Sequence, residues 1–564
     1  MVSLAKTRPA PLVAIRGLSI DGVTETGNIP IIDNVSLTLN RGEVLGLIGE
    51  SGAGKSTLGL ACMGFTRDGC VMRGGKIAFD GISLTHAHPR LRRRLLGRRI
   101  AYVAQSAAAS FNPAHKIIFQ HIEAPCIHRI MKKADAMKDA ISLYRKMRLP
   151  TPEVIGFRYP HQVSGGQLQR AMTAMAMACR PDLIIFDEPT TALDVTTQIE
   201  VLAAIRAIVA QLGTAAIYIS HDLAVVAQMA DRIKVLRHGK EVEEAATGAM
   251  LKNPKAEYTK SLWAVRHLTR PTTAIPSANT TPLIALANIT ASYGRGKGKP
   301  KGKPVLRNVS FAIHPGQTVA VVGESGSGKS TAARCITGLL PPQRGEILYQ
   351  GTPLPRHFSR RDREQLRQIQ MIYQMADTAL NPRLKIKEII GRPVEFYLGL
   401  KGKEKKRKIA NLMEAIEMDP SLYMNRKPSE LSGGQKQRIG IARALAAEPK
   451  FIICDEVTSA LDQLVAEGIL KLLTRLQQER GLAYMFITHD LSTVRAMADR
   501  VVIMKNGTVI EEGAKHKVLT PPHHPYTDLL LRSVPEMDPE WLTNLLQARQ
   551  KSPATTSHYI TIQG

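Results

Sequence analysis

Two nine-residue stretches of the chain combine closely spaced glycines with one lysine and several hydroxyl side chains. Each follows a short apolar run, Glu43–Ile48 or Gln317–Val322, and precedes helix-compatible sequence. In that order, glycine backbone N–H groups and the positive end of a helix converge on one point, which predicts a phosphate-binding loop rather than a plain glycine-rich turn. The residues expected to bind the phosphates are Gly49, Glu50, Ser51, Gly52, Ala53, Gly54, Lys55, Ser56 and Thr57, and Gly323, Glu324, Ser325, Gly326, Ser327, Gly328, Lys329, Ser330 and Thr331.

Within these loops the lysines and serines have separate expected roles. Lys55 and Lys329 are expected to reach the β- and γ-phosphates of ATP. Ser56 and Ser330 are expected to hold Mg²⁺.

Two acid pairs end apolar runs, Leu183–Phe186 and Phe451–Cys454. We expect the first acid of each pair, Asp187 or Asp455, to lie at the metal. The second acid, Glu188 or Glu456, is then the group that polarises the attacking water. An isolated Asp-Glu pair is often only a solvated strand end, but the order behind a phosphate loop favours the chemical role.

Further polar residues recur around these motifs. His221 and His489 are predicted to contact the γ-phosphate, with a surface or satisfied core histidine as the alternative. Gln105 and Gln374 are predicted to touch both metal and water, with a polar residue at a strand end as the alternative. Ser-Gly-Gly-Gln precedes a long helical stretch twice. It is either a second anion-binding device or simply a capped helix start. Its residues are Ser164, Gly165, Gly166 and Gln167, and Ser432, Gly433, Gly434 and Gln435.

The motifs recur because the chain is duplicated. The phosphate loops are offset by 274 residues, whereas Ser-Gly-Gly-Gln, the acid pair and the histidine are all offset by 268. A nearly constant offset across separate motifs indicates two copies of one large domain. We predict domains at 1–268 and 283–546, a Thr- and Pro-rich linker at 269–282, and a tail at 547–564.

Short buried strands alternate with helices in each copy, which predicts an α/β fold with a largely parallel sheet. The chain has 564 residues, with 44% apolar and 22% charged, so it can build large cores. No run of about 18 consecutive apolar residues occurs, so no membrane span is expected. None of the six cysteines forms a Cys-x-x-Cys pair, which argues against a zinc ribbon or a disulfide scaffold.

Taken together and present twice, this order of motifs resembles the nucleotide-binding subunits of ATP-binding cassette (ABC) transporters. The resemblance implies two tandem P-loop ATPase domains, each with a RecA-like core and a helical subdomain, here between Gln105 and Ser164 and between Gln374 and Ser432. It also implies two composite ATP sites, in which each phosphate loop faces the Ser-Gly-Gly-Gln motif of the other copy. Asp194 and Asp462 match the loop that joins the two sites.

Finer features are similar to the peptide/nickel importer subfamily. These features are Ser110–Pro113, Ala379–Pro382 and His524-Pro-Tyr-Thr527, the last echoed weakly by Glu257–Thr259. Many members carry a cysteine cluster in the C-terminal extension, but this chain has no cysteine after Cys454, so an iron–sulfur role is not expected.

One departure from the family pattern concerns the adenine base. Tyr293 lies where the family places an aromatic ring against the base, whereas Gly22 holds the equivalent position in the first copy. Since base stacking on an aromatic side chain contributes about 1–3 kcal/mol in nucleic-acid binders, we expect unequal ATP affinity at the two sites.

The resemblance implies a peripheral ATPase on the cytoplasmic face of a bacterial inner membrane. It would drive two transmembrane permease subunits and, indirectly, an extracytoplasmic solute-binding protein. The net charge of +28 includes one cluster at Arg90–Arg99 and another at Arg295–Lys303. Each is either a solvated face or a contact with the anionic membrane surface. The rival prediction is a soluble cassette ATPase acting on nucleic acid or the ribosome. We expect no nucleic-acid partner, because the connector is short and proline-broken.

Overall fold

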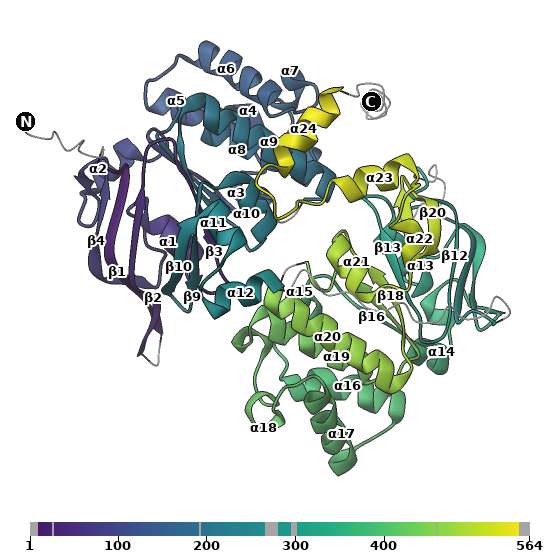
Figure 1. Ribbon diagram of the computed structural model, residues 1–564. Helices are drawn as coiled ribbons and strands as arrows, with labels where there is room; N and C mark the ends of the chain where they lie inside the picture. The colour runs from purple at the N-terminus through teal and green to yellow at the C-terminus, as the bar shows by residue number, and fades with distance from the viewer. Residues whose placement is uncertain are drawn as a thin grey trace, which may run out of the picture. The chain divides into compact units, whose positions relative to one another are not determined.

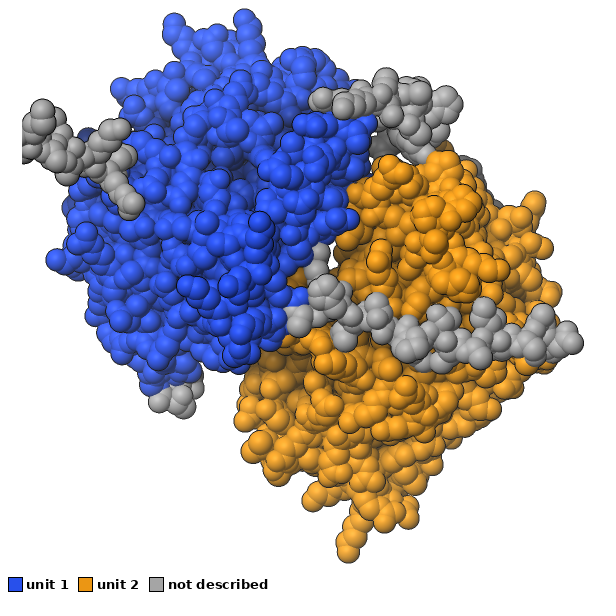
Figure 2. All heavy atoms as spheres, viewed as in Figure 1, with its two compact units in different colours: residues 1–264, 535–564 blue, residues 265–534 orange. Residues whose placement is uncertain are grey.

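The computed structural model describes residues 10–24, 27–190, 193–264, 280–294, 302–459 and 461–551. The chain forms two compact units: unit 1 comprises residues 1–264 and 535–564, and unit 2 comprises residues 265–534 (Figure 2). The sequence-based boundaries assigned residues up to 546 to the second domain, whereas the structure groups residues from Pro535 onward with unit 1. Residues 269–279 of the expected linker and 552–564 of the expected tail lie outside the described residues.

Unit 1 contains one mainly parallel sheet and one antiparallel sheet (Figure 1). The larger sheet has the order β10-β9-β3-β8-β7-β6, in which only β10 is antiparallel to its neighbour. Its strands are β3 (Val44–Ile48), β6 (Ile100–Val103), β7 (Leu183–Asp187), β8 (Ala215–Ile219), β9 (Arg232–Arg237) and β10 (Lys240–Ala246). The smaller sheet has the order β2-β1-β4-β5, with β1 (Val13–Thr24), β2 (Gly27–Leu39), β4 (Cys70–Phe79) and β5 (Ile82–Ser83).

The helices of unit 1 include an insert between β6 and β7. The insert contains α3 (Ala107–Ser110), α4 (Ile117–His121), α5 (Glu123–Ile127), α6 (Lys133–Lys146), α7 (Pro152–Ile155) and α8 (Gly165–Ala176). The other helices are α1 (Lys55–Ala61), α2 (Pro89–Leu95), α9 (Val195–Leu212), α10 (Leu223–Met229), α11 (Thr247–Lys252), α12 (Glu257–Ala264) and α24 (Trp541–Lys551).

Unit 2 repeats both sheets. The mainly parallel sheet has the order β16-β17-β18-β13-β19-β20, and the antiparallel sheet has the order β12-β11-β14-β15. The strands are β11 (Ile284–Ala291), β12 (Leu306–Ile313), β13 (Thr318–Val322), β14 (Arg344–Tyr349), β15 (Thr352–Pro353), β16 (Ile369–Ile372), β17 (Phe451–Asp455), β18 (Ala483–Ile487), β19 (Arg500–Lys505) and β20 (Thr508–Ala514).

The helices of unit 2 follow the same plan. The insert contains α15 (Ala376–Ala379), α16 (Ile386–Leu398), α17 (Gly402–Ala415), α18 (Pro420–Tyr423) and α19 (Gly433–Leu445). The others are α13 (Lys329–Ile336), α14 (Arg363–Gln368), α20 (Gln463–Arg480), α21 (Leu491–Met497), α22 (Lys515–Val518) and α23 (Pro525–Arg532).

Buried apolar strands form the centre of each unit. Every residue of β3, β7, β8, β13, β17 and β18 is buried, as expected for parallel strands covered on both faces. The predicted α/β class with two helical subdomains is therefore confirmed. Because the reactive residues follow the carboxyl ends of these strands, a rigid sheet edge positions them.

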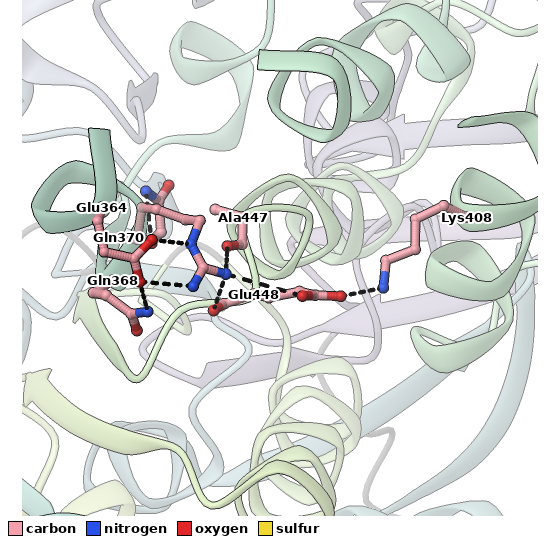
Figure 3. A network of polar contacts seen from close by, with 7 residues as sticks. Glu364, Gln368, Gln370, Lys408, Ala447 and Glu448 are labelled. Carbon is pink, nitrogen blue, oxygen red and sulfur yellow. Dashed lines mark hydrogen bonds and ion pairs between the residues drawn. The ribbon is translucent and has the colours of Figure 1, made fainter. Parts of the chain in front are cut away.

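A polar network joins the insert of unit 2 to the core (Figure 3). Arg367 of α14 pairs with Glu364 at 2.7 Å and donates to the carbonyl oxygens of Ala447 and Glu448 after α19. Lys408 of α17 pairs with the Glu448 carboxylate. The hydrogen bond from the Arg367 guanidinium is the main reason that the pKa of Glu364 is lowered to about 2, and the hydrogen bond from Gln368 is the next. These bonds fix the far end of α19 relative to the sheet.

Within the described ranges, one helix has the length and composition of a membrane span. Helix α9 has 18 residues, a mean hydropathy of 1.4 and 44% of its length buried. It contains Glu200 and Arg206 and begins after the Asp194 cap, a few residues beyond the β7 acid pair in the sequence. These features are those of a helix that packs against the sheet of a globular unit.

Candidate functional site

The two phosphate loops connect β3 to α1 and β13 to α13. Gly49 and Gly323 have φ angles of 153° and 158°, and an added Cβ would lie 2.1 Å from Leu236 O and 2.2 Å from Met504 O. Glycine is therefore required where each loop passes over the end of β9 or β19. Each loop lies between the strand and the helix that its sequence predicted.

Each loop lysine is buried and bonded to the loop itself. The Lys55 Nζ donates to Gly49 O at 2.7 Å and Glu50 O at 2.8 Å. In unit 2, Lys329 Nζ donates to the matching carbonyls, each at 2.8 Å. The loop carbonyls thus hold each ammonium group at the concave side of its loop, where it can meet a phosphate.

The loop serines lie next to the first acid of each pair. Ser56 Oγ donates to Asp187 Oδ1 at 2.9 Å, and Ser330 Oγ donates to Asp455 Oδ1 at 3.0 Å. Hydroxyl and carboxylate oxygens are ligands that Mg²⁺ accepts, usually with one or two carboxylates and substrate phosphates completing the shell. The residues expected at the metal therefore fit such an ion. Burial raises the pKa of Asp455, although the hydrogen bond from Ser330 opposes this shift.

The second acid of each pair faces the glutamine and the histidine. Gln105 Nε2 donates to Glu188 Oε2 at 3.0 Å, and His221 Nδ1 lies 3.1 Å from Glu188 Oε1. In unit 2, Gln374 Nε2 donates to Glu456 Oε2 at 2.6 Å, and His489 Nδ1 lies 3.5 Å from Glu456 Oε1. The three residue types that the sequence predicted to act together therefore do meet in each unit.

Both glutamates have a left-handed backbone, with φ of 49° at Glu188 and 48° at Glu456. Residues other than glycine adopt this region at a cost, and such residues concentrate at functional sites. This turn directs each side chain away from the strand and toward its histidine.

The neighbouring glutamates raise the pKa of both histidines. Burial lowers the pKa of His221, but the hydrogen bond and charge of Glu188 outweigh it, so the pKa is raised above 6.5. At His489 burial also lowers the pKa, but the hydrogen bond and charge of Glu456 outweigh burial, so the pKa is raised. The pKa of Glu456 is lowered because the His489 hydrogen bond and charge outweigh burial. Glu456 is thus favoured as a carboxylate, the form required of a base.

The Ser-Gly-Gly-Gln motifs begin α8 and α19. Ser164 Oγ accepts from Gln167 N at 3.3 Å, and Ser432 Oγ accepts from Gln435 N at 3.3 Å; each glutamine side chain returns a bond to the serine N–H. These are capping boxes. The glycine N–H groups remain at the helix start, so capping and anion binding are compatible.

The residues predicted to join the sites are also helix caps. Asp194 accepts from Thr197 N and Asp462 from Val465 N, each at 3.0 Å, at the starts of α9 and α20. Neither lies among the Lys, Asp, Glu and His contacts of its own unit.

Tyr293 is 44% exposed beside the second phosphate-loop helix. Its hydroxyl lies 3.1 Å from Thr331 Oγ1, and Arg334 donates to it at 3.3 Å. Gly22 lies at the matching position of unit 1, where an added Cβ would approach Ile31 Cδ1 at 3.0 Å. At this position the described residues thus have an aromatic ring in unit 2 and a glycine in unit 1.

Sequence reasoning missed Tyr102, whose hydroxyl donates to Asp187 Oδ2 at 2.6 Å. It follows the same strand as Gln105, but Met371 matches it in the second copy, so the repeat gave no signal. It also missed the contacts of Tyr258 and Tyr526 with the phosphate loops, although the Tyr-Thr motifs that contain them were recognised.

Some arginines of the predicted basic cluster at 90–99 are bonded within unit 1, and the others are exposed. Arg92 donates to Gly64 O at 3.0 Å, and Arg99 pairs with Asp80 and Asp182. Arg90, Arg93, Arg94 and Arg98 are exposed. Of the second cluster, only Lys303 lies inside the described ranges.

Comparison with known families gives two matches. The family described as "ABC transporter" matches residues 32–191 and 306–459. The family described as "Oligopeptide/dipeptide transporter, C-terminal region" matches residues 510–560, which include the His524–Thr527 motif.

Similar curated proteins extend over nearly the whole chain. The glutathione import ATP-binding protein GsiA of Pectobacterium atrosepticum is 34% identical, over 94% of this chain and 90% of that protein. The protein of the same name in Escherichia coli O157:H7 is 36% identical with the same coverage. A solved structure of a dimeric ATP-binding cassette in a post-hydrolysis state, bound to ADP and Pi, is 32% identical; it covers 41% of this chain and 98% of that chain, with a TM-score of 0.36.

Proposed function

The chain belongs to the ABC transporter family, with a C-terminal region of the oligopeptide/dipeptide type, and we propose that it powers import of a small peptide through separate membrane permeases. It is an ATP-binding protein and an ATPase. The observation that supports ATP hydrolysis is the duplicated cluster of loop lysine, acid pair, glutamine and histidine, complete in both units. Peptide as the cargo is supported by the match of residues 510–560 to the oligopeptide/dipeptide C-terminal region.

The chemical roles follow from the contacts. Lys55 and Lys329 bind phosphate oxygens, while Ser56 with Asp187, and Ser330 with Asp455, would hold Mg²⁺. When bound, that ion neutralises phosphate charge. Glu188 and Glu456 accept the proton of the attacking water. His221 and His489 orient these carboxylates and contact the γ-phosphate, and Gln105 and Gln374 orient the water.

We further propose that each ATP is held by two motifs from opposite copies. The phosphate loop 49–57 would act with Ser432–Gln435, and the loop 323–331 with Ser164–Gln167. Asp194 and Asp462 would connect the two sites. Support comes from the capped helix starts, whose glycine N–H groups suit a phosphate and lie outside the acid cluster of their own unit.

The helical inserts are the proposed contact with two permease subunits. In unit 1, Phe119, Ile127 and Val154 are 44%, 68% and 51% exposed; in unit 2, Phe396 and Leu422 are 57% and 56% exposed. Exposed large apolar side chains on these inserts are available for a protein contact, which is what the proposal requires. The chain would then lie on the cytoplasmic face of the bacterial inner membrane, with an extracytoplasmic binding protein delivering the solute. The exposed arginines of α2 suit the anionic membrane surface.

The relatives' names favour glutathione or a similar small peptide as cargo, and a metal chelate is the other candidate. The test compares uptake of labelled glutathione, a dipeptide and a nickel chelate in cells with the intact system and in cells expressing Glu188→Gln/Glu456→Gln. The proposal is supported if the cells with the intact system take up the peptide and the cells that express the variant do not. If the chain instead fractionates with nucleic acid or ribosomes and is released by nuclease, the importer function is wrong.

A further inference from the structure

The Tyr-Thr motif of the C-terminal region occurs twice, and in both copies its tyrosine contacts the phosphate loop. The Tyr258 hydroxyl accepts a hydrogen bond from Glu50 N at 3.2 Å, and the Tyr526 hydroxyl accepts one from Glu324 N at 3.2 Å. We propose that Tyr258 and Tyr526 are positioning residues for ATP binding, which hold the first turn of each phosphate loop in its binding conformation. This inference rests on the proposed ATP sites and assigns them two further residues.

Each tyrosine is fixed from several sides. Tyr258 is 8% exposed and Tyr526 is 0% exposed. The Arg237 guanidinium lies 4.6 Å from the Tyr258 ring centroid, and the Lys505 ammonium lies 4.4 Å from that of Tyr526. These cations end β9 and β19, directly after the residues over which Gly49 and Gly323 pass. Ring, cation and loop therefore pack at one point of each sheet edge.

The helices that carry the tyrosines are anchored by matching glutamates. Glu243 of β10 accepts from Lys255 N at 2.9 Å and Ala256 N at 3.0 Å, just before α12. Glu511 of β20 accepts from Thr527 Oγ1 at 2.5 Å and from His524 N at 3.3 Å, at the start of α23. Both glutamates thus tie the tyrosine helix to the strand beside the loop.

The bond acts on a residue that the loop lysine also contacts. Glu50 donates its N–H to Tyr258, while its carbonyl accepts from Lys55; Glu324 is held in the same way by Tyr526 and Lys329. When the lysine turns toward a phosphate, its bond to this carbonyl weakens, but the tyrosine bond does not depend on it. The hydroxyl therefore keeps the loop ordered during the exchange. Burial raises the pKa of Tyr258 to about 12, so the hydroxyl is neutral and fixed in its role at ordinary pH.

The test uses the full chain and removes only the hydroxyls, by Tyr258→Phe and Tyr526→Phe. Phenylalanine keeps the packing and the cation contact. ATP affinity is measured at each site separately. Lys329→Ala disables the second loop so that only the first binds ATP, and Lys55→Ala disables the first loop so that only the second binds ATP. Since one neutral hydrogen bond contributes about 0.5–1.5 kcal/mol, we expect Kd and KM for ATP to rise roughly 2- to 12-fold with kcat unchanged.

Tyr484→Phe is the matched control, because Tyr484 is also buried and donates to Leu473 O at 3.1 Å, away from the loop. It is expected to lower Tm to a similar extent without changing KM. If Tyr258→Phe and Tyr526→Phe behave like this control, the tyrosines are only structural and the inference is overturned. If the unmodified chain itself binds no ATP, the proposed function fails instead, and the two failures are thus distinguished.

Discussion

Unit 1 and unit 2 have the same reactive groups but different surroundings for them. Beside the phosphate-loop helix of unit 2, Tyr293 contacts Thr331 and Arg334, whereas the first copy has Gly22 and Leu60 at the positions of Tyr293 and Arg334. The loop lysine, acid pair, glutamine and histidine make matching contacts in both units, so we expect the same chemistry at both proposed sites. Nucleotide affinity, by contrast, is expected to differ.

The two units also differ beside the acid pair and in the helix that follows the histidine, which is α10 in unit 1 and α21 in unit 2. Tyr102 donates to Asp187 in unit 1, and Met371 stands in its place in unit 2. Gln228 of α10 donates to the carbonyls of Glu536 and Asp538, each at 2.8 Å, and accepts from Leu542 N at 3.0 Å. Its match, Ala496 in α21, has no side chain for such bonds. The C-terminal segment therefore packs on α10 of unit 1 through bonds that the second copy cannot make at Ala496.

The largest expected effect concerns the shared groups. Glu188→Gln and Glu456→Gln each remove one proposed base, and loss of a general base costs typically 10²- to 10⁴-fold in rate. We expect the double variant to lose turnover and to retain ATP tightly, as measured by phosphate release and nucleotide retention.

The single variants sharpen the comparison of the two units. If both sites hydrolyse, Glu188→Gln and Glu456→Gln impair turnover to a similar degree. Full activity in one single variant would show that its site contributes no hydrolysis. Retained activity in the double variant would refute the assignment of both bases.

Gln228→Glu is expected to destabilise unit 1 strongly. A carboxylate cannot donate to the carbonyls of Glu536 and Asp538 and would be a buried charge facing them, with the Leu542 N–H as its remaining donor. A buried charge without a charged partner costs about 3–5 kcal/mol. Thermal unfolding followed by calorimetry measures the loss. The control is Ala496→Gln, which adds the same amide to the other copy. An unchanged Tm in Gln228→Glu would mean that the C-terminal segment does not pack on α10.

Tyr293→Ala removes the aromatic surface beside the second loop. From the range of about 1–3 kcal/mol for base stacking, we expect ATP affinity at that site to fall roughly 5- to 150-fold. Titration in a Lys55→Ala chain isolates the site, and Tyr293→Phe is the control that keeps the ring. Unchanged affinity in Tyr293→Ala would contradict the predicted difference between the sites.

Tyr102→Phe tests the smaller difference at the metal-side carboxylate. Asp187 is buried, and removing one of its two donors should cost about 1–3 kcal/mol in the absence of nucleotide. We expect a lower Tm that Mg²⁺ and ATP largely restore. Met371→Leu, the control in the other unit, should leave Tm nearly unchanged. A Tyr102→Phe chain as stable as the original would remove this distinction between the units.

Sequence predicted most of the site because its signals are local. Loop glycines, strand-end acids and helix caps depend on neighbours within a few residues, so expected roles could be assigned to Lys55, Asp187 and Ser164 from sequence, and these roles stay predictions. The family, the α/β class and the peptide-importer subfamily are confirmed by the comparisons.

Contacts between distant segments were not predictable in the same way. Tyr258 lies 208 residues from Glu50, and Gln228 lies 314 residues from Leu542. No spacing rule links such positions, and only the fold brings them together. Tyr102 was missed for a related reason, since its partner strand is adjacent in the sheet but not in the sequence.

The pairing of motifs across the two copies is the central claim, and a photoreactive ATP analogue with its reactive group on the γ-phosphate tests it most directly. In a Lys55→Ala chain only the second loop keeps its lysine, so the analogue binds there. We predict crosslinks to Lys329–Thr331 and to Ser164–Gln167, identified by mass spectrometry. Crosslinks to Ser432–Gln435 in place of Ser164–Gln167 would contradict the account, because each site would then be built within one copy.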